Sequence, residues 1–190
     1  MSDGPVLVVS DTHLGFQSPS AERFRRFVQY LTKWVQDGET TIEKMDKPLI
    51  APQKIILLGD FLDLLISRDP NIVRPYQESF DIINSLVALG REIVYVVGNH
   101  DDAMRSYAGS HIFHNWHVYM DRYPETCVNG KWQGVPIGEK TYLFLHGHQF
   151  DIFGYESVIH FSNFIGSATI AAQGFRKFTY LGGVIFALSF

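Results

Sequence analysis

Residues 55–63, Ile-Ile-Leu-Leu-Gly-Asp-Phe-Leu-Asp, constrain the fold more than any other stretch of the chain. Four consecutive apolar residues are typical of a strand that is buried on both faces of a sheet. The strand ends at Gly59, and Asp60 follows at its carboxyl end. Open α/β sheets bind ligands at this edge, where a carboxylate such as Asp60 can bridge two metal ions, and Asp63 is close enough to support it. An ordinary turn with a solvated aspartate is the alternative.

The apolar run at residues 6–10 is followed directly by Asp11-Thr12-His13. In an extended segment, residues two apart point to the same side. Asp11 and His13 are therefore predicted to hold one metal ion together, through a carboxylate oxygen and an imidazole nitrogen. A turn after the strand that leaves the histidine on the surface is the alternative.

A third apolar run, residues 92–97, ends in Gly98-Asn99-His100-Asp101. The amide oxygen of Asn99 is a neutral metal ligand. His100 can give a proton to a leaving group, and Asp101 can hold His100 in one tautomer. A tight turn with an incidental histidine is the alternative, although this is the third polar cluster at the end of a strand.

Two stretches between these runs have the spacing of amphipathic helices. The first begins at Ser18-Pro19 and is predicted to end at Gly38. The second begins at Pro75 and is predicted to end at Gly90. The alternation of strand and helix predicts an α/β fold with a largely parallel central sheet. All three polar clusters then lie on the same edge of that sheet.

A fourth polar cluster, His146-Gly147-His148, follows residues 141–145, which predict another buried strand. His146 is placed to complete a metal site. For His148 we predict contact with the substrate or support of a metal ligand, because Gly147 can turn it elsewhere.

The stretch before this strand is less regular. Asn129-Gly130 predicts a β-hairpin. His111, His114 and His117 have a spacing that fits neither face of a strand, and only partly fits a helix. We interpret them as pocket-lining or surface residues in preference to metal ligands.

Composition narrows the classes of function. The 190 residues are enough for one domain with a sizeable core, and 46% of them are hydrophobic. The net charge of −4 shows no basic excess and argues against non-specific nucleic-acid binding. The single cysteine, Cys127, suits a reducing compartment. The first strand begins almost at once, without the pattern of a signal peptide, so the cytoplasm is the predicted location.

The four clusters resemble the motifs of the calcineurin-like metallophosphoesterase superfamily and occur in the family's order. The matching motifs are Asp11-x-His13, Gly59-Asp60-x-x-Asp63, Gly98-Asn99-His100-Asp101 and His146-Gly147-His148. The resemblance implies a two-layer αββα fold with a dinuclear metal centre. It implies that Asp11 and His13 bind the first metal and that Asp60 bridges both. Asn99 and His146 would then bind the second metal.

The resemblance also implies roles around the metals. His100, oriented by Asp101, would be the proton donor or a phosphate contact. Apart from the resemblance, we predict that Asp63 and His148 contact the substrate. The nucleophile would be a hydroxide that bridges two Mn²⁺ ions, with Fe or Zn as alternatives. The bond hydrolysed is a phosphodiester, a pyrophosphate or a phosphomonoester, in a small-molecule or lipid-linked substrate. The alternative function is a non-catalytic scaffold that binds partners.

The end of the chain departs from the family. His-Gly-x-x-Phe-Asp at residues 146–151 resembles UDP-diacylglucosamine pyrophosphatases, although that subgroup often has Arg where His100 stands. The family's last motif, Gly-His-x-His, does not occur after His148, so we expect the fold to be incomplete at its C-terminal end. Alternatively, His146 and His148 are themselves that final pair.

Residues 152–190 form an apolar tail with three charged residues, Glu156, Arg176 and Lys177. No uninterrupted apolar run in it reaches the ~20 residues of a spanning helix. We expect core helices whose partners lie in further sequence. A lid over an apolar substrate or a contact with a membrane surface is the alternative, and it would make the protein peripheral to the membrane.

Overall fold

A computed structural model describes residues 4–15, 19–43, 45–64, 74–109, 111–112 and 115–148 of the chain. The predicted tail, residues 152–190, lies outside the described residues, as do residues 149–151 of the last predicted motif. The single-domain prediction for residues 1–190 therefore remains a prediction.

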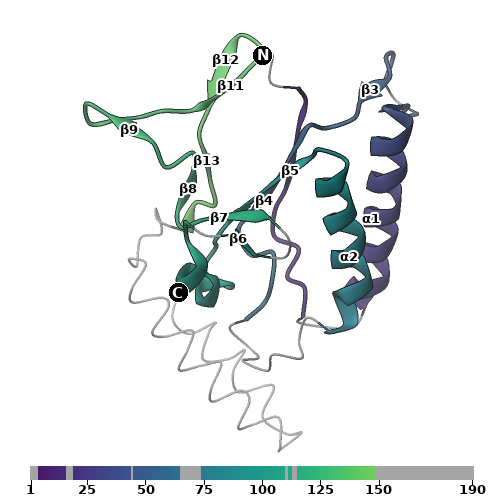
Figure 1. The fold of residues 1–190 in the computed structure, drawn as a ribbon, viewed down its shortest axis with the longest axis horizontal. Coiled ribbons are helices and arrows are strands. Elements are labelled where there is room, and N and C mark those ends of the chain that lie inside the picture. Colours follow the sequence, from purple (N-terminus) through teal and green to yellow (C-terminus); the bar gives the residue numbers. More distant parts are fainter. Residues whose placement is uncertain are drawn as a thin grey trace, which may run out of the picture.

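A five-stranded sheet forms the centre of the molecule (Figure 1). Its strands, in spatial order, are β1 (Val6–Val9), β4 (Lys54–Leu58), β5 (Glu92–Val96), β7 (Trp116–Tyr119) and β6 (His111–Ile112). The first four strands run parallel, and only β6 is antiparallel to its neighbour. The predicted α/β class with a central parallel sheet is confirmed.

Two helices lie side by side on one face of this sheet, α1 (Pro19–Asp37) and α2 (Gln77–Ala88) (Figure 1). Both end where a glycine was predicted to stop them. Gly38 and Gly90 have φ values of 81° and 77°, the left-handed conformation that commonly follows a helix. Beneath the helices, Phe24, Phe80 and Trp116 belong to a fully packed aromatic core.

The alternation of side chains along a strand sends every second residue to the other face. Ile55 and Leu57 of β4 pack in the core beneath the helices, whereas Ile56 packs in a second core on the opposite face. Tyr123 and Val135 cover that second core. The strand at residues 55–58 is therefore buried on both faces, as its continuous apolar run predicted.

Short two-stranded ladders complete the fold. They are β8 (Arg122–Tyr123) with β13 (Phe144–Leu145), β9 (Cys127–Val128) with β10 (Lys131–Trp132), β11 (Val135–Ile137) with β12 (Lys140–Tyr142), and β2 (Glu39–Thr40) with β3 (Leu49–Ile50). The hairpin predicted at Asn129-Gly130 is confirmed: it joins β9 to β10, and both turn residues have positive φ, 51° and 74°.

Two expectations for the second half of the chain are wrong. Residues 141–145 are not one buried strand, because β12 pairs with β11 whereas β13 pairs with β8, and their residues are exposed or half-buried. The segment around His117 is not irregular, because it forms β7. There Trp116 and Val118 are buried and alternate with half-buried His117 and Tyr119. This period of two indicates a strand, and the spacing of the histidines alone did not reveal it.

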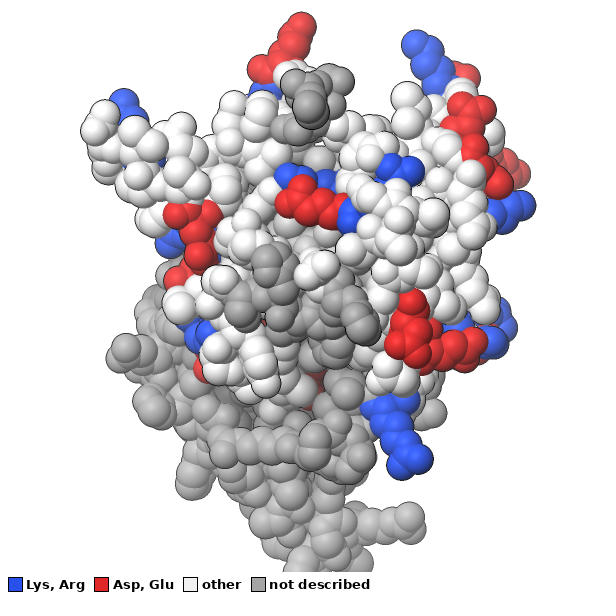
Figure 2. Space-filling model, in the orientation of Figure 1, with Lys and Arg blue, Asp and Glu red and all other residues white. Residues whose placement is uncertain are grey.

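Charged side chains are mixed over the described surface. In the view of Figure 2, lysines and arginines are interspersed with acidic side chains, and no continuous basic field forms over the described residues. Within the described ranges, no helix has the length and apolar character needed to cross a membrane.

Candidate metal centre

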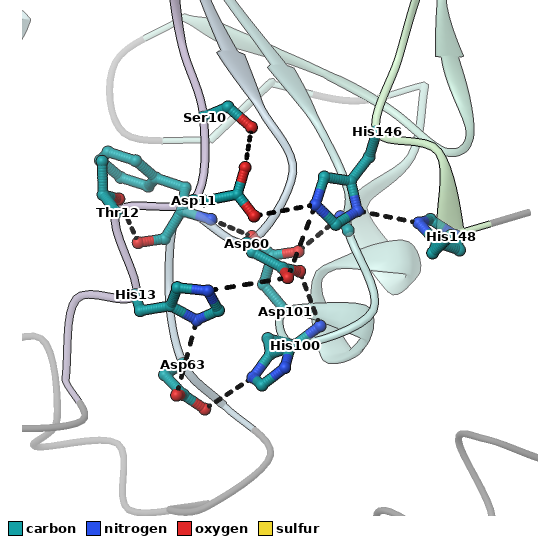
Figure 3. Close-up of polar contacts among 12 residues, drawn as sticks. Ser10, Asp11, Thr12, His13, Asp60, Asp63, His100, Asp101, His146 and His148 are labelled. Carbon is teal, nitrogen blue, oxygen red and sulfur yellow. Dashed lines mark hydrogen bonds and ion pairs between the residues drawn. The ribbon is translucent and has the colours of Figure 1, made fainter. Parts of the chain in front are cut away.

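The three polar clusters after β1, β4 and β5 meet at the carboxyl edge of the central sheet, as predicted. His146 of the fourth cluster reaches them from β13 (Figure 3). Backbone hydrogen bonds join the loops that carry them. His13 donates its N–H to the carbonyl of Asp60 at 2.9 Å, and Gly59 donates to Val96 at 2.8 Å. The carbonyl of His100 accepts from the N–H of the residue after Asp63 at 3.0 Å. The loops after β1, β4 and β5 therefore form one connected unit.

Three site residues hold the left-handed backbone conformation that non-glycine residues rarely adopt. The φ values are 54° for Asp11, 45° for His13 and 49° for Asp60. Such strain persists where surrounding structure imposes it, and it concentrates at functional sites. The loop from Asp11 to His13 is therefore not extended as expected, although both side chains lie with Asp60 (Figure 3).

Two glycines make room for the site. A Cβ atom on Gly59 would lie 2.3 Å from the ring of His146, and one on Gly98 would lie 2.3 Å from Oδ1 of Asp60. Neither contact is sterically allowed. Each glycine is therefore required by the side chain of a candidate ligand that crosses directly over it.

Asp60 is the centre of the arrangement. Its Oδ2 lies 3.5 Å from Nε2 of His146 and 3.9 Å from Nε2 of His13, and its Oδ1 accepts the backbone N–H of His100 at 2.8 Å. The carboxyl group is almost fully buried, with 4% of the residue exposed. Nε2 of His146 also lies 3.5 Å from Oδ1 of Asp11.

Two groups of side chains have ligand atoms close enough to hold a cation, each within 4.8 Å of one another. The first group is Asp11, Asp60 and His146, and the second is His13, Asp60 and His100. Asp60 belongs to both groups, as a bridging carboxylate must. The division differs from the predicted one, because Asp11 lies with His146 and His13 lies with His100.

Asn99 occupies the predicted loop after β5 and is half-buried. Its side chain makes no hydrogen bond to the other site residues in the part of the chain that the structure describes. The structure thus places Asn99 in the unit that carries His100 but leaves its role as a ligand a prediction.

Asp63 was expected to contact the substrate, but its carboxylate meets two histidines instead. Its Oδ1 lies 3.3 Å from Nδ1 of His100, and its Oδ2 lies 3.7 Å from Nδ1 of His13. Asp63 is only 3% exposed. The hydrogen bond to Asp63 is the main reason why the pKa of His100 is raised, against the opposing effect of burial. Asp63 therefore orients both imidazoles.

Asp101 was expected to orient His100, and this expectation is wrong. The Asp101 carboxylate is fully buried and accepts four hydrogen bonds, none of them from His100. The donors are Phe61 N at 2.9 Å, Leu62 N at 3.4 Å, Gly98 N at 2.6 Å and the hydroxyl of Tyr95 at 2.5 Å. Asp101 thus fastens the loop of Asp60 to the loop of Asn99. Burial is the main cause of its raised pKa.

Tyr95 is the residue that sequence reasoning missed. It is fully buried in β5, and its only polar atom, the hydroxyl, reaches Asp101. A tyrosine in an otherwise aliphatic buried strand is the signal that could have found it, because a buried hydroxyl needs a partner.

His148 lies beside His146 and in neither of the two ligand groups. The two Nδ1 atoms are 3.0 Å apart. Burial, with smaller effects from His146 and Arg105, lowers the pKa of His148 to about 4. Of the other predicted histidines, His117 stacks on Tyr119 away from both groups, and the side chains of His111 and His114 lie outside the described residues.

The charge balance of the site fits divalent cations. Four carboxylates gather here, those of Asp11, Asp60, Asp63 and Asp101, and three of them are buried. Among the described residues, no lysine or arginine forms an ion pair with any of the four, so histidines are their only basic neighbours. Buried carboxylates need compensation, and carboxylate oxygens with imidazole nitrogens are a donor set that divalent metals accept.

Comparison with known proteins identifies the class. The model of the calcineurin-like phosphoesterase family matches residues 4–169, so the chain belongs to this family. Its members use divalent metal ions, and membership indicates metal-dependent hydrolysis of phosphoester bonds. No curated protein matches the chain.

Among solved structures, the nuclease MPE of Pseudomonas putida is similar to this chain, at 16% identity and a TM-score of 0.38. The similarity covers 70% of this chain and 56% of the nuclease chain.

Proposed function

We propose that this protein is a phosphoesterase with two divalent cations, both held by Asp60. Asp11 and His146 complete the protein side of one position, and His13 with Asn99 lies toward the other. The observation that carries the proposal is the position of Asp60, a buried carboxylate whose Oδ2 faces an imidazole nitrogen on either side, at 3.5 and 3.9 Å.

When bound, such cations withdraw charge from phosphoryl oxygens and lower the pKa of the attacking water. The chain's own residues supply orientation and a proton. Asp63 holds the ring of His100 through Nδ1, and we propose that His100 gives a proton to the leaving oxygen, a step that contributes ~10²–10⁴-fold. Asp101 acts further away, by holding the two loops together.

We propose Mn²⁺ as the metal, with Fe or Zn as alternatives, because the donor set mixes oxygen and nitrogen. The substrate class is a phosphodiester, pyrophosphate or phosphomonoester. A lipid-linked substrate like that of UDP-diacylglucosamine pyrophosphatases is a narrower proposal that rests on the motif at residues 146–151. Contact of residues 152–190 with a membrane surface, completion of the metal site by a Gly-His-x-His segment and a cytoplasmic location likewise stay predictions.

A hydrolysis assay tests the proposal. The purified chain, loaded with Mn²⁺, is offered p-nitrophenyl phosphate, bis-p-nitrophenyl phosphate and a pyrophosphate. We expect turnover of at least one, loss of activity in chelator and recovery with metal. Asp60→Asn is the matched control, because it changes the shared ligand and keeps the shape. Absence of turnover from folded, metal-loaded protein would instead favour the non-catalytic scaffold.

A further inference from the structure

We propose that His148 is a positioning residue that fixes the ring of His146 with its Nε2 directed at the metal centre. The inference rests on the proposed function, because it takes His146 as a metal ligand. It replaces the expected substrate contact of His148 with a contact to a ligand.

The two ring nitrogens of His146 have different neighbours. Nε2 faces inward and lies 3.5 Å from both Oδ2 of Asp60 and Oδ1 of Asp11. Nδ1 faces outward and lies 3.0 Å from Nδ1 of His148 (Figure 3). The ring therefore has one side for the site and one side for His148.

The contact between the two imidazoles determines which of the two Nδ1 atoms carries a hydrogen. Two ring nitrogens 3.0 Å apart form a hydrogen bond only if one carries a hydrogen and the other is bare. A neutral His146 that binds a cation through Nε2 must carry its hydrogen on Nδ1. It follows that Nδ1 of His146 donates and Nδ1 of His148 accepts, which selects one tautomer for each ring.

The backbone between the two histidines supports this pairing. Gly147 has a φ of 102°, in a region that favours glycine, so the chain turns sharply and brings residues 146 and 148 into contact. Among the described residues, no atom lies within 4 Å of a Cβ built on Gly147. An alanine there would meet backbone strain and no clash with these residues, so Gly147→Ala tests the turn.

The pairing also differs from the rest of the site. His13 and His100 turn Nδ1 toward the carboxylate of Asp63, whereas His146 turns Nδ1 toward an imidazole. A partner that accepts a hydrogen bond from a ligating histidine fixes its orientation, and its removal typically costs 10–100-fold in metal affinity. His148 supplies this orientation without adding a fifth carboxylate to a site that already gathers four.

The first experiment needs no metal. Nitrogen-15 NMR of the full chain, stripped with chelator, separates an N–H from a bare nitrogen in each imidazole. We expect His146 to carry its hydrogen on Nδ1, and His148 to have a bare Nδ1. In His148→Leu, His146 should become a mixture of tautomers. A wild-type His146 with its hydrogen on Nε2 would overturn the proposal.

The second experiment is a calorimetric titration with Zn²⁺. We expect His148→Leu to weaken binding ~10–100-fold with unchanged stoichiometry. His148→Asn, whose side-chain oxygen can accept the same hydrogen bond, should restore most of the affinity, and Gly147→Ala should lie between. His117→Leu, a half-buried histidine outside both ligand groups, is the control for folding.

Each other result has a defined meaning. Unchanged affinity in His148→Leu would overturn the proposal, and so would a loss of one bound Zn²⁺, because His148 would then be a ligand. If the wild-type protein binds neither Zn²⁺ nor Mn²⁺, the proposed function fails. The tautomer of His146 in the metal-free protein would still decide the role of His148.

Discussion

The two edges of the central sheet differ in the charges of their ionisable side chains. At the amino edge, Lys54 begins β4 and Glu92 begins β5, in direct register, and Nζ of Lys54 lies 3.1 Å from Oε2 of Glu92. The hydroxyl of Tyr123 meets both side chains. At the carboxyl edge, the four carboxylates contact histidines and backbone N–H groups and, among the described residues, form no ion pair with a lysine or arginine. Charges at the first edge satisfy one another, whereas those at the second form a donor set that divalent cations accept.

The largest effect is expected from Asp60→Asn. Turnover should fall by more than the ~10²–10⁴-fold of a single proton donor, because both cations lose their shared ligand. The fold should survive, since Asn tolerates the φ of 49° and relieves a buried charge. Steady-state kinetics and circular dichroism measure the two quantities. Normal turnover in the folded variant would contradict the assignment of Asp60.

Within the same edge, His100→Ala should lower turnover ~10²–10⁴-fold and leave metal content nearly unchanged. The physical reason is that a proton donor is needed at the leaving group, whereas a ligand is needed for binding. Elemental analysis beside the kinetic assay separates these roles. A variant that has lost one metal would show that His100 belongs to the ligand group in which the structure places it.

Asp101→Asn makes the same substitution at a buried carboxylate that binds the backbone of two loops and belongs to neither ligand group. We expect a loss of ~2–3 kcal/mol in the free energy of unfolding, because the amide nitrogen of Asn would face an N–H that now donates to a carboxylate oxygen. Denaturant unfolding measures this loss, with Asp60→Asn as the control. If the two variants are equally stable, Asp101 does not fasten the loops as we infer.

The smallest effect is expected at the amino edge. Lys54→Met should cost about 1 kcal/mol or less and should not change turnover, because Glu92 is half-exposed and the pair is far from the site. The same urea titrations, read beside the kinetic assay, provide the measurement. A large loss of activity would show that the two edges are coupled, contrary to the comparison.

The amino edge should also respond to pH. Burial lowers the pKa of Lys54, but its bonds to Tyr123 and Glu92 outweigh this and the pKa is raised; burial raises the pKa of Tyr123. Both groups therefore keep their protons longer in the folded chain. Their contribution is complete below about pH 10 and is lost as the pH rises further. Urea unfolding of the wild-type protein across that range should therefore show a stability that falls as the pH rises.

Much of this arrangement could be predicted from local signals. A continuous apolar run identified the doubly buried strand at residues 55–58. Gly38 and Gly90 marked the helix ends, because a left-handed residue commonly terminates a helix. Asn129-Gly130 identified a hairpin for a similar reason. Parallel strands have their carboxyl ends at one edge, and this brought together the three polar clusters that follow β1, β4 and β5. The fourth cluster, at His146, follows β13, which lies outside the central sheet.

What the sequence determined by itself was which polar clusters meet after β1, β4 and β5, because burial follows from periodicity and strand direction from the alternation of strands and helices. Only the tertiary structure decided which atoms face one another. The positive φ values of Asp11, His13 and Asp60 turn these side chains away from the directions that an extended chain would give. As a result, the carboxylate of Asp63 contacts His100, and the carboxylate of Asp101 accepts hydrogen bonds from the backbone of two loops. Such angles are imposed by hydrogen bonds between loops far apart in the chain, and spacing along the sequence carries no record of them.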